Sequence, residues 1–373
     1  MIVGVPTEIK DNERRVGLTP ASVAELVRHD HTVLVQSGAG VGIGADDRVY
    51  EGVGAKIVAG ADEVFAGADL VIKVKEPQPV ERARLRPEQT LFTYLHLAPD
   101  PDQTADLLAS GAIAVAYETV TDARGNLPLL APMSKVAGRL AVQAAAHHLE
   151  SAYGGAGLLL GGVPGVAPAK VVIIGGGVVG ENAAQIAIGM GADVTVLDRD
   201  NSVLDRLANR FGTAVHTMYS TGHSLEAAVI DADVVIGAVL VPGAAAPELV
   251  TADMVARMRP GSVLVDVAID QGGCFETSHP TTHSEPVFIV DGVVHYCVAN
   301  MPGAVPRTSA HALNNATLPF VLALADLGTG DALRADPHLA NGLNIAGGRV
   351  TEPAVAEASG YQPLSRTEAV RWL

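Results

Sequence analysis

Three glycines in G-x-G-x-x-G spacing are the strongest chemical signal in this 373-residue sequence. Gly175, Gly177 and Gly180 follow the apolar, β-branched run 171–174, which is typical of a buried parallel strand. The first glycine permits a tight turn, the second lets a pyrophosphate approach the backbone, and the third permits close packing of helix on strand. The helix that follows would direct free N–H groups and its positive dipole end at the phosphates. The spacing therefore predicts a dinucleotide-binding site.

A carboxylate at the end of the next predicted strand supports this interpretation. Asp198 follows the run 193–197, at the distance from the glycines where an acid can accept hydrogen bonds from both ribose hydroxyls. A glycine-rich turn in an ordinary α/β protein is the alternative, but it leaves Asp198 unexplained. Arg199 could contact a 2′-phosphate, yet Asp198 would repel that phosphate, so we expect NAD rather than NADP as the cofactor.

Four other polar residues follow apolar, strand-like runs and are candidates for chemistry. Ligands of open parallel sheets bind at the carboxyl ends of the strands, which is where such residues would lie. A single one of them could equally be a surface charge or a hydrogen-bonded loop residue, whereas four beside a nucleotide fold favour an active site. They are Arg15 after 2–5, Lys75 after 70–74, His96 after 91–95 and Asp270 after 263–267.

The elements that must position these residues alternate between strand and helix in two stretches of the chain. Strand-like runs lie at 2–5, 32–36, 70–74, 91–95 and 112–117, and again at 171–174, 194–197, 234–239, 263–267 and 293–298. Thr19 is predicted to cap the first helix, with Pro20 at its first position. Such alternation is typical of parallel α/β domains, and the second stretch makes a complete dinucleotide-binding domain.

Two further helices suggest how the domains are connected. An Ala-rich helix is expected over 134–150, followed by a Gly/Pro-rich loop, and another helix over 308–327. The late helix cannot extend the nucleotide sheet, so we expect it to return to the first domain. We therefore predict an α/β protein with two Rossmann-like, parallel-sheet domains, which are residues 1–133 plus 306–373 and residues 134–305. A cofactor and substrate cleft is expected between them.

Composition limits the remaining function classes. The net charge of −16 and the scattered Lys and Arg residues argue against a nucleic-acid partner. The stretch 151–169 has no charge but six glycines and two prolines, so we expect no membrane span and a cytoplasmic protein, since no leader is evident. Cys274 and Cys297 form no C-x-x-C pair and are expected to be buried thiols. No histidine has a convincing ligand spacing, so we predict no required metal.

At these residues the sequence also resembles the alanine dehydrogenase and pyridine nucleotide transhydrogenase family, which is related to saccharopine dehydrogenases. The motifs that carry the resemblance cover residues 1 to about 320, and together they are highly specific. They lie at 13–20, 73–77, 94–97, 130–134, 175–180, 239–243, 266–273 and 298–302.

The resemblance implies roles for the four polar candidates. Arg15 would hold the substrate carboxylate in a two-pronged contact, which suits its planar guanidinium. Lys75 would bind the carbonyl oxygen of pyruvate and stabilise negative charge there. His96 would move protons, since histidine titrates near neutral pH. Asp270 would accept hydrogen bonds from the substrate amine or the attacking water and contact the nicotinamide ribose.

The resemblance also implies a set of cofactor contacts. Asn300 and Met301 would flank the nicotinamide. The rest of the cofactor site would be lined by Ser134, Val178, Val179, Ser220, Val239, Leu240 and Val298. Two positions depart from the family pattern, because Val203 stands where a basic residue is frequent and His279 where Arg is frequent. Both lie away from the reacting carbons, so we expect altered cofactor affinity and retained activity.

The implied reaction is the reversible oxidative deamination of L-alanine to pyruvate and ammonium, with hydride transfer to NAD. A homohexamer is usual in the family. The main alternative is the nucleotide-binding subunit of a proton-translocating transhydrogenase, but the loop 132–138 matches the dehydrogenase form. A non-catalytic NAD-binding regulator would not need the four polar residues, and a saccharopine-type enzyme would need a larger pocket.

Overall fold

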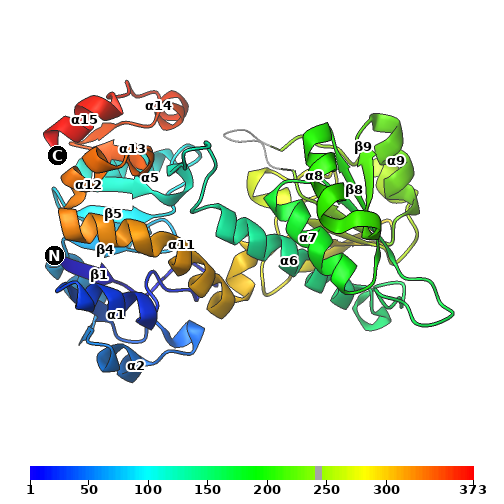
Figure 1. Ribbon diagram of the computed structural model, residues 1–373, viewed down its shortest axis with the longest axis horizontal. Helices are drawn as coiled ribbons and strands as arrows, with labels where there is room; N and C mark the ends of the chain where they lie inside the picture. Colours follow the sequence, from blue (N-terminus) through cyan, green and yellow to red (C-terminus); the bar gives the residue numbers. More distant parts are fainter. Residues whose placement is uncertain (240–245) are drawn as a thin grey trace. The chain divides into compact units, whose positions relative to one another are not determined.

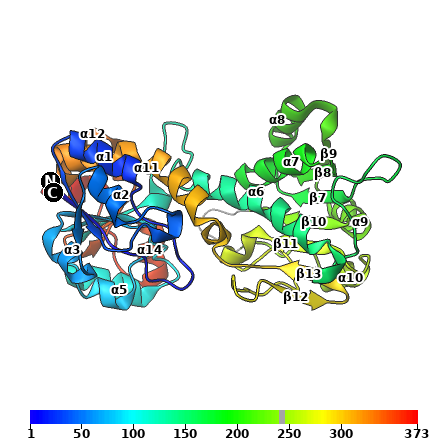
Figure 2. The ribbon, with the colours of Figure 1, turned by 90° about the horizontal axis from the view of Figure 1, so that it is seen from below.

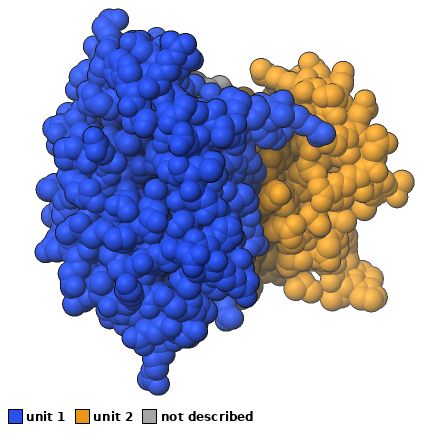
Figure 3. Space-filling view, turned by 60° about the vertical axis from the view of Figure 1, so that its left-hand side comes forward, with its two compact units in different colours: residues 1–133, 305–373 blue, residues 134–304 orange. Residues whose placement is uncertain are grey.

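The computed structural model describes residues 1–239 and 246–373, and the chain divides into two compact units. Unit 1 consists of Met1–Met133 and Val305–Leu373, and unit 2 of Ser134–Ala304 (Figure 3). Each unit is built on its own β-sheet with helices on both faces. The predicted fold class, two mostly parallel α/β sheets, is confirmed.

The sheet of unit 1 has eight strands in the order β15-β14-β6-β5-β4-β1-β2-β3. Strands β1 to β6 are parallel, whereas β14 runs antiparallel to β6 and β15 antiparallel to β14. The direction of winding reverses between β1 and β4, which makes their carboxyl ends the switch point where ligands of such sheets bind. The strands are β1 (Ile2–Val5), β2 (Thr32–Gln36), β3 (Lys56–Val58), β4 (Leu70–Ile72), β5 (Thr90–Thr93), β6 (Ile113–Ala116), β14 (Leu343–Ala346) and β15 (Arg349–Val350).

Helices cover both faces of this sheet. Figure 2 shows α1 (Pro20–Arg28), α11 (Pro306–Leu327) and α12 (Thr329–Ala335) on one face, and α3 (Ala61–Gly67), α5 (Pro101–Ser110) and α14 (Pro353–Ser359) on the other. The other helices of unit 1 are α2 (Asp47–Gly52), α4 (Pro79–Arg82), α13 (Pro337–Ala340) and α15 (Arg366–Trp372). No single helix in the described part of the chain is long and apolar enough to span a membrane. Helices α11 and α12 meet that test only as a pair, and they are bent by 120°.

The first helix begins as predicted but is held in a different way. Thr19 is at the N-cap of α1 and Pro20 is its first residue, yet the Thr19 side chain accepts no capping hydrogen bond. Its Oγ1 lies 3.3 Å from Ser22 Oγ, and its backbone N–H donates to Asn314 Oδ1 of α11 at 2.8 Å. Asn314 also donates to the carbonyl of Gly17 at 3.1 Å, so α11 anchors the loop that leads into α1.

The sheet of unit 2 has seven strands in the order β12-β13-β11-β10-β7-β8-β9 (Figure 2), and all but β12 are parallel. Figure 1 labels β8 and β9, the last two strands in this order. The winding reverses between β7 and β10. The strands are β7 (Lys170–Ile174), β8 (Asp193–Asp198), β9 (His216–Tyr219), β10 (Val234–Gly237), β11 (Val263–Asp266), β12 (Val287–Val290) and β13 (Val293–Tyr296). The helices are α6 (Ala131–His148), α7 (Val178–Gly189), α8 (Asn201–Phe211), α9 (Gly222–Asp231) and α10 (Ala252–Ala256).

Every predicted strand exists, but five strands were not predicted. These are β3, β9, β12, β14 and β15, which lie at or next to a sheet edge. Strand β9 is exposed along its whole length, so it lacks the buried apolar run that marks a central strand. Strands β14 and β15 occupy the tail, where the sequence shows only a weak pattern.

Candidate functional site

The polar candidates of unit 1 lie at the carboxyl ends of neighbouring strands. Arg15 is in the loop after β1, Lys75 follows β4, and His96 follows β5. Strand β4 pairs with β1 on one side and with β5 on the other, so the three residues lie at the carboxyl ends of three neighbouring strands. Asp270 belongs to unit 2, where it follows β11.

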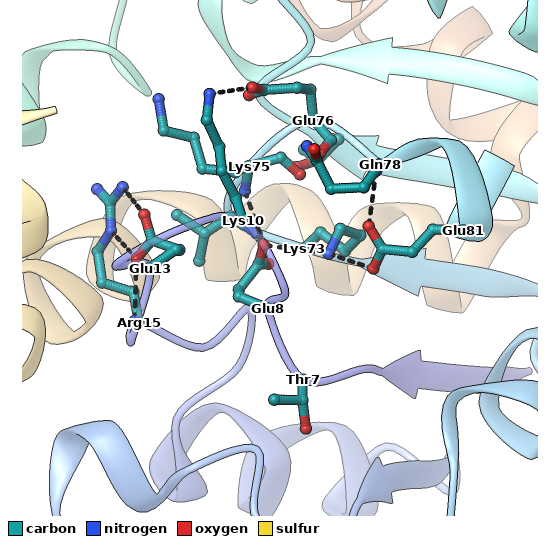
Figure 4. A network of polar contacts seen from close by, with 12 residues as sticks. Thr7, Glu8, Lys10, Glu13, Arg15, Lys73, Lys75, Glu76, Gln78 and Glu81 are labelled. Atoms are coloured by element: carbon teal, nitrogen blue, oxygen red, sulfur yellow. Dashed lines mark hydrogen bonds and ion pairs between the residues drawn. The ribbon is translucent and has the colours of Figure 1, made fainter. Parts of the chain in front are cut away.

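Arg15 is buried and forms a two-pronged ion pair with Glu13. Its Nε donates to Glu13 Oε1 at 2.7 Å, and its Nη2 donates to Oε2 (Figure 4). The remaining terminal nitrogen, Nη1, lies 3.1 Å from Met133 Sδ. The guanidinium therefore keeps one orientation, with its Nε side turned to Glu13.

A second buried charge cluster holds the segment that carries Lys75. Lys73 is completely buried between Glu8 and Glu81, with Nζ at 3.1 Å and 2.8 Å from their carboxylate oxygens (Figure 4). Burial by itself would lower the pKa of Lys73, but the two carboxylates raise it above its ordinary value. Glu8 also accepts a hydrogen bond from the backbone N–H of Val74 at 2.6 Å. The chain just before Lys75 is thus tied to the loop that follows β1.

His96 has an unusual backbone and an accessible ring. Its φ is +49°, in the left-handed region, and 47% of its side chain is exposed. Its ring stacks on Tyr94 with the centroids 5.9 Å apart. Its backbone N–H donates to Glu118 at 2.6 Å, and its Nδ1 lies 3.9 Å from the same carboxylate. A proton-transfer residue must be both accessible and held, and His96 is both.

The glycine loop of unit 2 has the geometry that a pyrophosphate requires. Gly175 has φ of +97°, and a Cβ at Gly180 would lie 1.8 Å from the carbonyl oxygen of Gly175. A Cβ at Gly177, in contrast, would meet no atom within 4 Å, so this part of the backbone is open to a ligand. Helix α7 begins at Val178 and directs its N-terminus at this opening. These residues fit the pyrophosphate of a pyridine nucleotide.

Asp198 ends β8 beside this loop. Its Oδ2 accepts a hydrogen bond from the backbone N–H of Gly176 at 2.7 Å. The carbonyl of Gly176 accepts one from Arg206 at 2.9 Å. Ser220 follows β9, and its backbone N–H donates to the carbonyl of Asp198 at 2.9 Å. Asp198 is therefore beside the glycines, as the predicted ribose contact requires.

Asp270 joins two segments that follow neighbouring strands. It lies in the 3-10 helix Val267–Gln271 after β11, and its Oδ1 accepts a hydrogen bond from the N–H of Asn300 at 3.1 Å. Asn300 follows β13 and has φ of +57°. Met301 is buried and begins the next short helix, Met301–Ala304, and Val298 is also buried.

The other predicted cofactor residues lie close to the glycine loop or outside the described residues. A Cβ at Gly138 would lie 2.1 Å from the carbonyl oxygen of Val179, so α6, which contains Ser134, packs closely on the start of α7. Val178 is exposed at the N-terminus of α7. Val239 follows β10, whereas Leu240 and most of the motif 239–243 lie outside the described residues.

Four further expectations concern Val203, His279, the two cysteines and metal binding. Val203 lies directly beside Gly176, because a Cβ added at Gly176 would be 2.6 Å from Val203 Cγ1. His279 stacks on Phe288 with the ring centroids 3.7 Å apart. Cys274 and Cys297 are both buried and free, as predicted. Across residues 1–239 and 246–373, no group of three or more His, Cys, Asp or Glu side chains is arranged to hold a metal.

Four residues that the sequence did not single out complete this geometry. Glu8, Glu13 and Glu118 are the carboxylates that hold the segments of Lys75, Arg15 and His96. Glu13 and Lys73 entered the sequence analysis only as parts of motifs. A signal for them existed, since acidic residues in loops after apolar strands are candidates for the same reason as the four polar residues.

Comparison with known proteins places this geometry in a family. Residues 4–137 match the N-terminal domain, and residues 141–353 the C-terminal domain, of the alanine dehydrogenase/PNT family. The chain is 61% identical to the alanine dehydrogenase of Halomonas elongata, over 97% of this chain and 98% of that protein. It is 52% identical to the alanine dehydrogenase of Bacillus subtilis, over 100% and 98%.

Solved structures agree with the sequence matches. An L-alanine dehydrogenase structure matches with a TM-score of 0.93 and 52% identity, over 96% of this chain and 99% of that one. A transhydrogenase from Sinorhizobium meliloti matches with a TM-score of 0.80 and 25% identity, over 95% and 100%. On both its domains and nearly its whole length, this chain belongs to the alanine dehydrogenase/PNT family of pyridine nucleotide oxidoreductases.

Proposed function

We propose that the protein catalyses the reversible, NAD-dependent oxidative deamination of L-alanine to pyruvate and ammonium. The observation that carries this proposal is the pairing of two features in one chain. The carboxyl ends of the central strands of unit 1 carry Arg15, Lys75 and His96. Unit 2 has an open glycine loop beside Asp198. The relatives with 52% and 61% identity, which are alanine dehydrogenases, support the same reaction.

Arg15 would bind the carboxylate shared by alanine and pyruvate. Glu13 takes the guanidinium edge formed by Nε and Nη2. We therefore expect the substrate to meet the end formed by the two terminal nitrogens, which also matches a carboxylate. Because Glu13 fixes the guanidinium plane, little side-chain entropy is lost when the substrate binds.

The remaining residues would manage charge and protons. The glycine loop and Asp198 would hold NAD, which would supply the hydride acceptor for Cα of alanine. Lys75 would stabilise the negative charge that develops on the substrate oxygen. His96 would take a proton from the water that adds to the iminium carbon and return it to the amine of the carbinolamine. It would then take the hydroxyl proton as ammonia leaves and the carbonyl of pyruvate forms. Asp270 would accept a hydrogen bond from the amine or from that water.

The choice of cofactor follows from Asp198. Its carboxylate can accept hydrogen bonds from ribose hydroxyls, and it would repel the 2′-phosphate of NADP. The substrates L-alanine, pyruvate and ammonium would be the protein's partners, without nucleic acid or membrane, in a cytoplasmic homohexamer of the kind usual in the family.

The test is NADH formation, followed by absorbance, with L-alanine and with a panel of other amino acids, using NAD and NADP separately. We expect L-alanine with NAD to be the preferred pair and pyruvate with ammonium to drive the reverse reaction. Binding of NADH without turnover of any amino acid would reject the enzyme and favour a regulator. Hydride exchange between two nucleotides, again without amino-acid turnover, would favour a transhydrogenase subunit.

A further inference from the structure

The peptide between Leu95 and His96 is held from both sides by side chains of other elements. The carbonyl of Leu95 accepts a hydrogen bond from Gln103 Nε2 at 2.6 Å. On the opposite side, the N–H of His96 donates to Glu118 Oε1 at 2.6 Å. Because a peptide unit is planar, two such bonds fix its orientation and with it the direction in which the His96 side chain leaves the backbone.

Glu118 takes the backbone hydrogen bonds just beyond the end of β5. Strand β5 ends at Thr93, and the N–H of Tyr94 still donates to the carbonyl of Val74 at 3.3 Å. The carboxylate of Glu118 accepts from both Leu95, at 3.2 Å, and His96. It therefore satisfies two consecutive backbone donors, one of which belongs to the buried residue Leu95.

The left-handed conformation of His96 needs this support. A non-glycine residue with positive φ is costly, and it persists only when the surroundings hold it. Strained backbone of this kind occurs frequently at functional sites, and here it brings an accessible imidazole to the carboxyl end of β5.

Glu118 and Gln103 are themselves firmly placed. Glu118 follows β6, whose residue Ala116 is paired with Thr93 of β5, and its neighbour Tyr117 donates from its hydroxyl to the carbonyl of Lys73 at 3.0 Å. Gln103 is completely buried in the first turn of α5. Rigid supports of this kind are what precise positioning requires.

The charge of Glu118 adds a second effect. Its Oε1 lies 3.9 Å from His96 Nδ1. Tyr94 stacks on the His96 ring, and its hydroxyl donates to the carbonyl of Leu129. A carboxylate on this side favours a proton on Nδ1, which leaves Nε2 as the nitrogen that can accept a proton from the substrate.

We infer that Glu118 is the positioning residue for His96, with Gln103 as the second support of the same peptide. Glu118 holds the left-handed backbone and orients the imidazole for proton transfer. This inference rests on the proposed function, because it assumes that His96 moves protons.

The decisive experiment is a double-mutant cycle of Glu118→Ala and His96→Ala, measured as kcat, KM for pyruvate and Kd for NADH. Glu118→Ala should lower kcat by roughly 10²-fold, as small displacements of a catalytic group do. It should leave the Kd for NADH unchanged, because the nucleotide loop is in the other unit. In the His96→Ala background the same substitution should have almost no further effect.

One conservative variant separates the two actions of Glu118, and a second variant tests the support from Gln103. Glu118→Gln keeps an oxygen that can accept from both N–H groups but removes the charge, so kcat should fall less than in Glu118→Ala. Gln103→Leu removes the support of the Leu95 carbonyl and should also lower kcat. Glu63→Gln is the matched control, because exposed Glu63 likewise accepts a backbone hydrogen bond, from Ala59 at 3.1 Å, and should behave as wild type.

The outcomes distinguish the inference from the function on which it rests. An equal loss of kcat from Glu118→Ala with and without His96 would overturn the positioning inference while the enzyme stands. Wild-type kcat in His96→Ala would instead reject His96 as the proton-transfer residue. If Glu118→Ala does not fold, which a lowered Tm would reveal, the same cycle is run with Glu118→Gln.

Discussion

The carboxylate of Asp198 accepts a hydrogen bond from the backbone N–H of Gly176 at 2.7 Å. The acid that is expected to select the ribose is thus also a support of the glycine loop. Arg206 donates a hydrogen bond to the carbonyl of Gly176 at 2.9 Å. We therefore expect ribose selection and pyrophosphate binding to be linked through Gly176, so substitutions at position 198 should affect both.

Replacing Asp198 with Gly should shift cofactor preference toward NADP. The substitution removes the repulsion of the 2′-phosphate and the hydrogen bonds to the ribose. Charge-assisted hydrogen bonds are worth roughly 1.5–3 kcal/mol, so affinity for NAD should fall about ten- to a hundredfold. Asp198→Asn is the control, because its amide oxygen can still accept from Gly176. Kd values for both nucleotides in both variants are the measurement, and an unchanged NAD preference in Asp198→Gly would show that position 198 does not contact the ribose.

His96→Ala should lower kcat by roughly 10²-fold or more, since general acid–base catalysis contributes ~10²–10⁴-fold. Affinity for NADH should stay close to wild type, because the nucleotide loop lies in unit 2. Steady-state kinetics and NADH fluorescence titration test the two statements separately. Near-normal turnover would reduce His96 to a structural loop residue.

Arg15→Lys should chiefly raise KM for pyruvate. A single ammonium cannot reproduce the planar contact with a carboxylate, and it would also leave Glu13 with one prong in place of two. Glu13→Gln keeps the guanidinium and provides the comparison, with a smaller rise in KM. If KM for pyruvate does not change in Arg15→Lys, the carboxylate binds elsewhere, and Arg14 is the first alternative to test.

Gly180→Ala should destabilise unit 2 and abolish tight NADH binding. The new Cβ would lie 1.8 Å from the carbonyl oxygen of Gly175, so the loop or the helix must move. Overpacking typically costs about 1–3 kcal/mol. Gly189→Ala, at the other end of α7, meets no atom within 4 Å and should leave stability and binding unchanged or improved. Urea unfolding and NADH titration of both variants decide the matter.

The stability of unit 2 should decrease as the pH falls through the histidine range. Burial lowers the pKa of His295 below its ordinary value of 6.5, although a hydrogen bond to the carbonyl of Val293 opposes the shift. The unfolded chain then binds more protons than the folded one between the lowered pKa and 6.5. The stability is therefore fully present above that range and is lost progressively as the pH falls through it.

Urea unfolding at pH 7.5, 6.5 and 5.5 measures this loss. His295→Gln should flatten the pH dependence, whereas His223→Gln, which replaces an exposed histidine, should leave it as in wild type. A pH dependence that is equally steep in His295→Gln would assign it to other groups, and His148, whose pKa burial also lowers, is the next candidate.

The sequence alone determined the elements that carry the site. Gly175, Gly177 and Gly180 have the spacing of a strand, tight turn and helix that bind a dinucleotide, so the nucleotide loop can be predicted from local sequence. Buried strands such as β7 and β10 are indicated by their apolar runs. Lys75 and His96 come soon after such strands, and Arg15 lies in the loop after β1, so their place at the carboxyl end of the sheet follows from the chain order and the parallel topology.

Only the tertiary structure decided what holds these residues. Glu118, which follows the neighbouring strand β6, accepts a hydrogen bond from the N–H of His96. Gln103 of helix α5 donates one to the carbonyl of Leu95. Glu8 meets Lys73 across 65 positions of the chain. No local pattern encodes such partners, because a hydrogen bond or ion pair depends on distance in space and on burial. Strands at sheet edges are also hard to predict from the sequence, since exposure removes the apolar pattern by which strands are recognised.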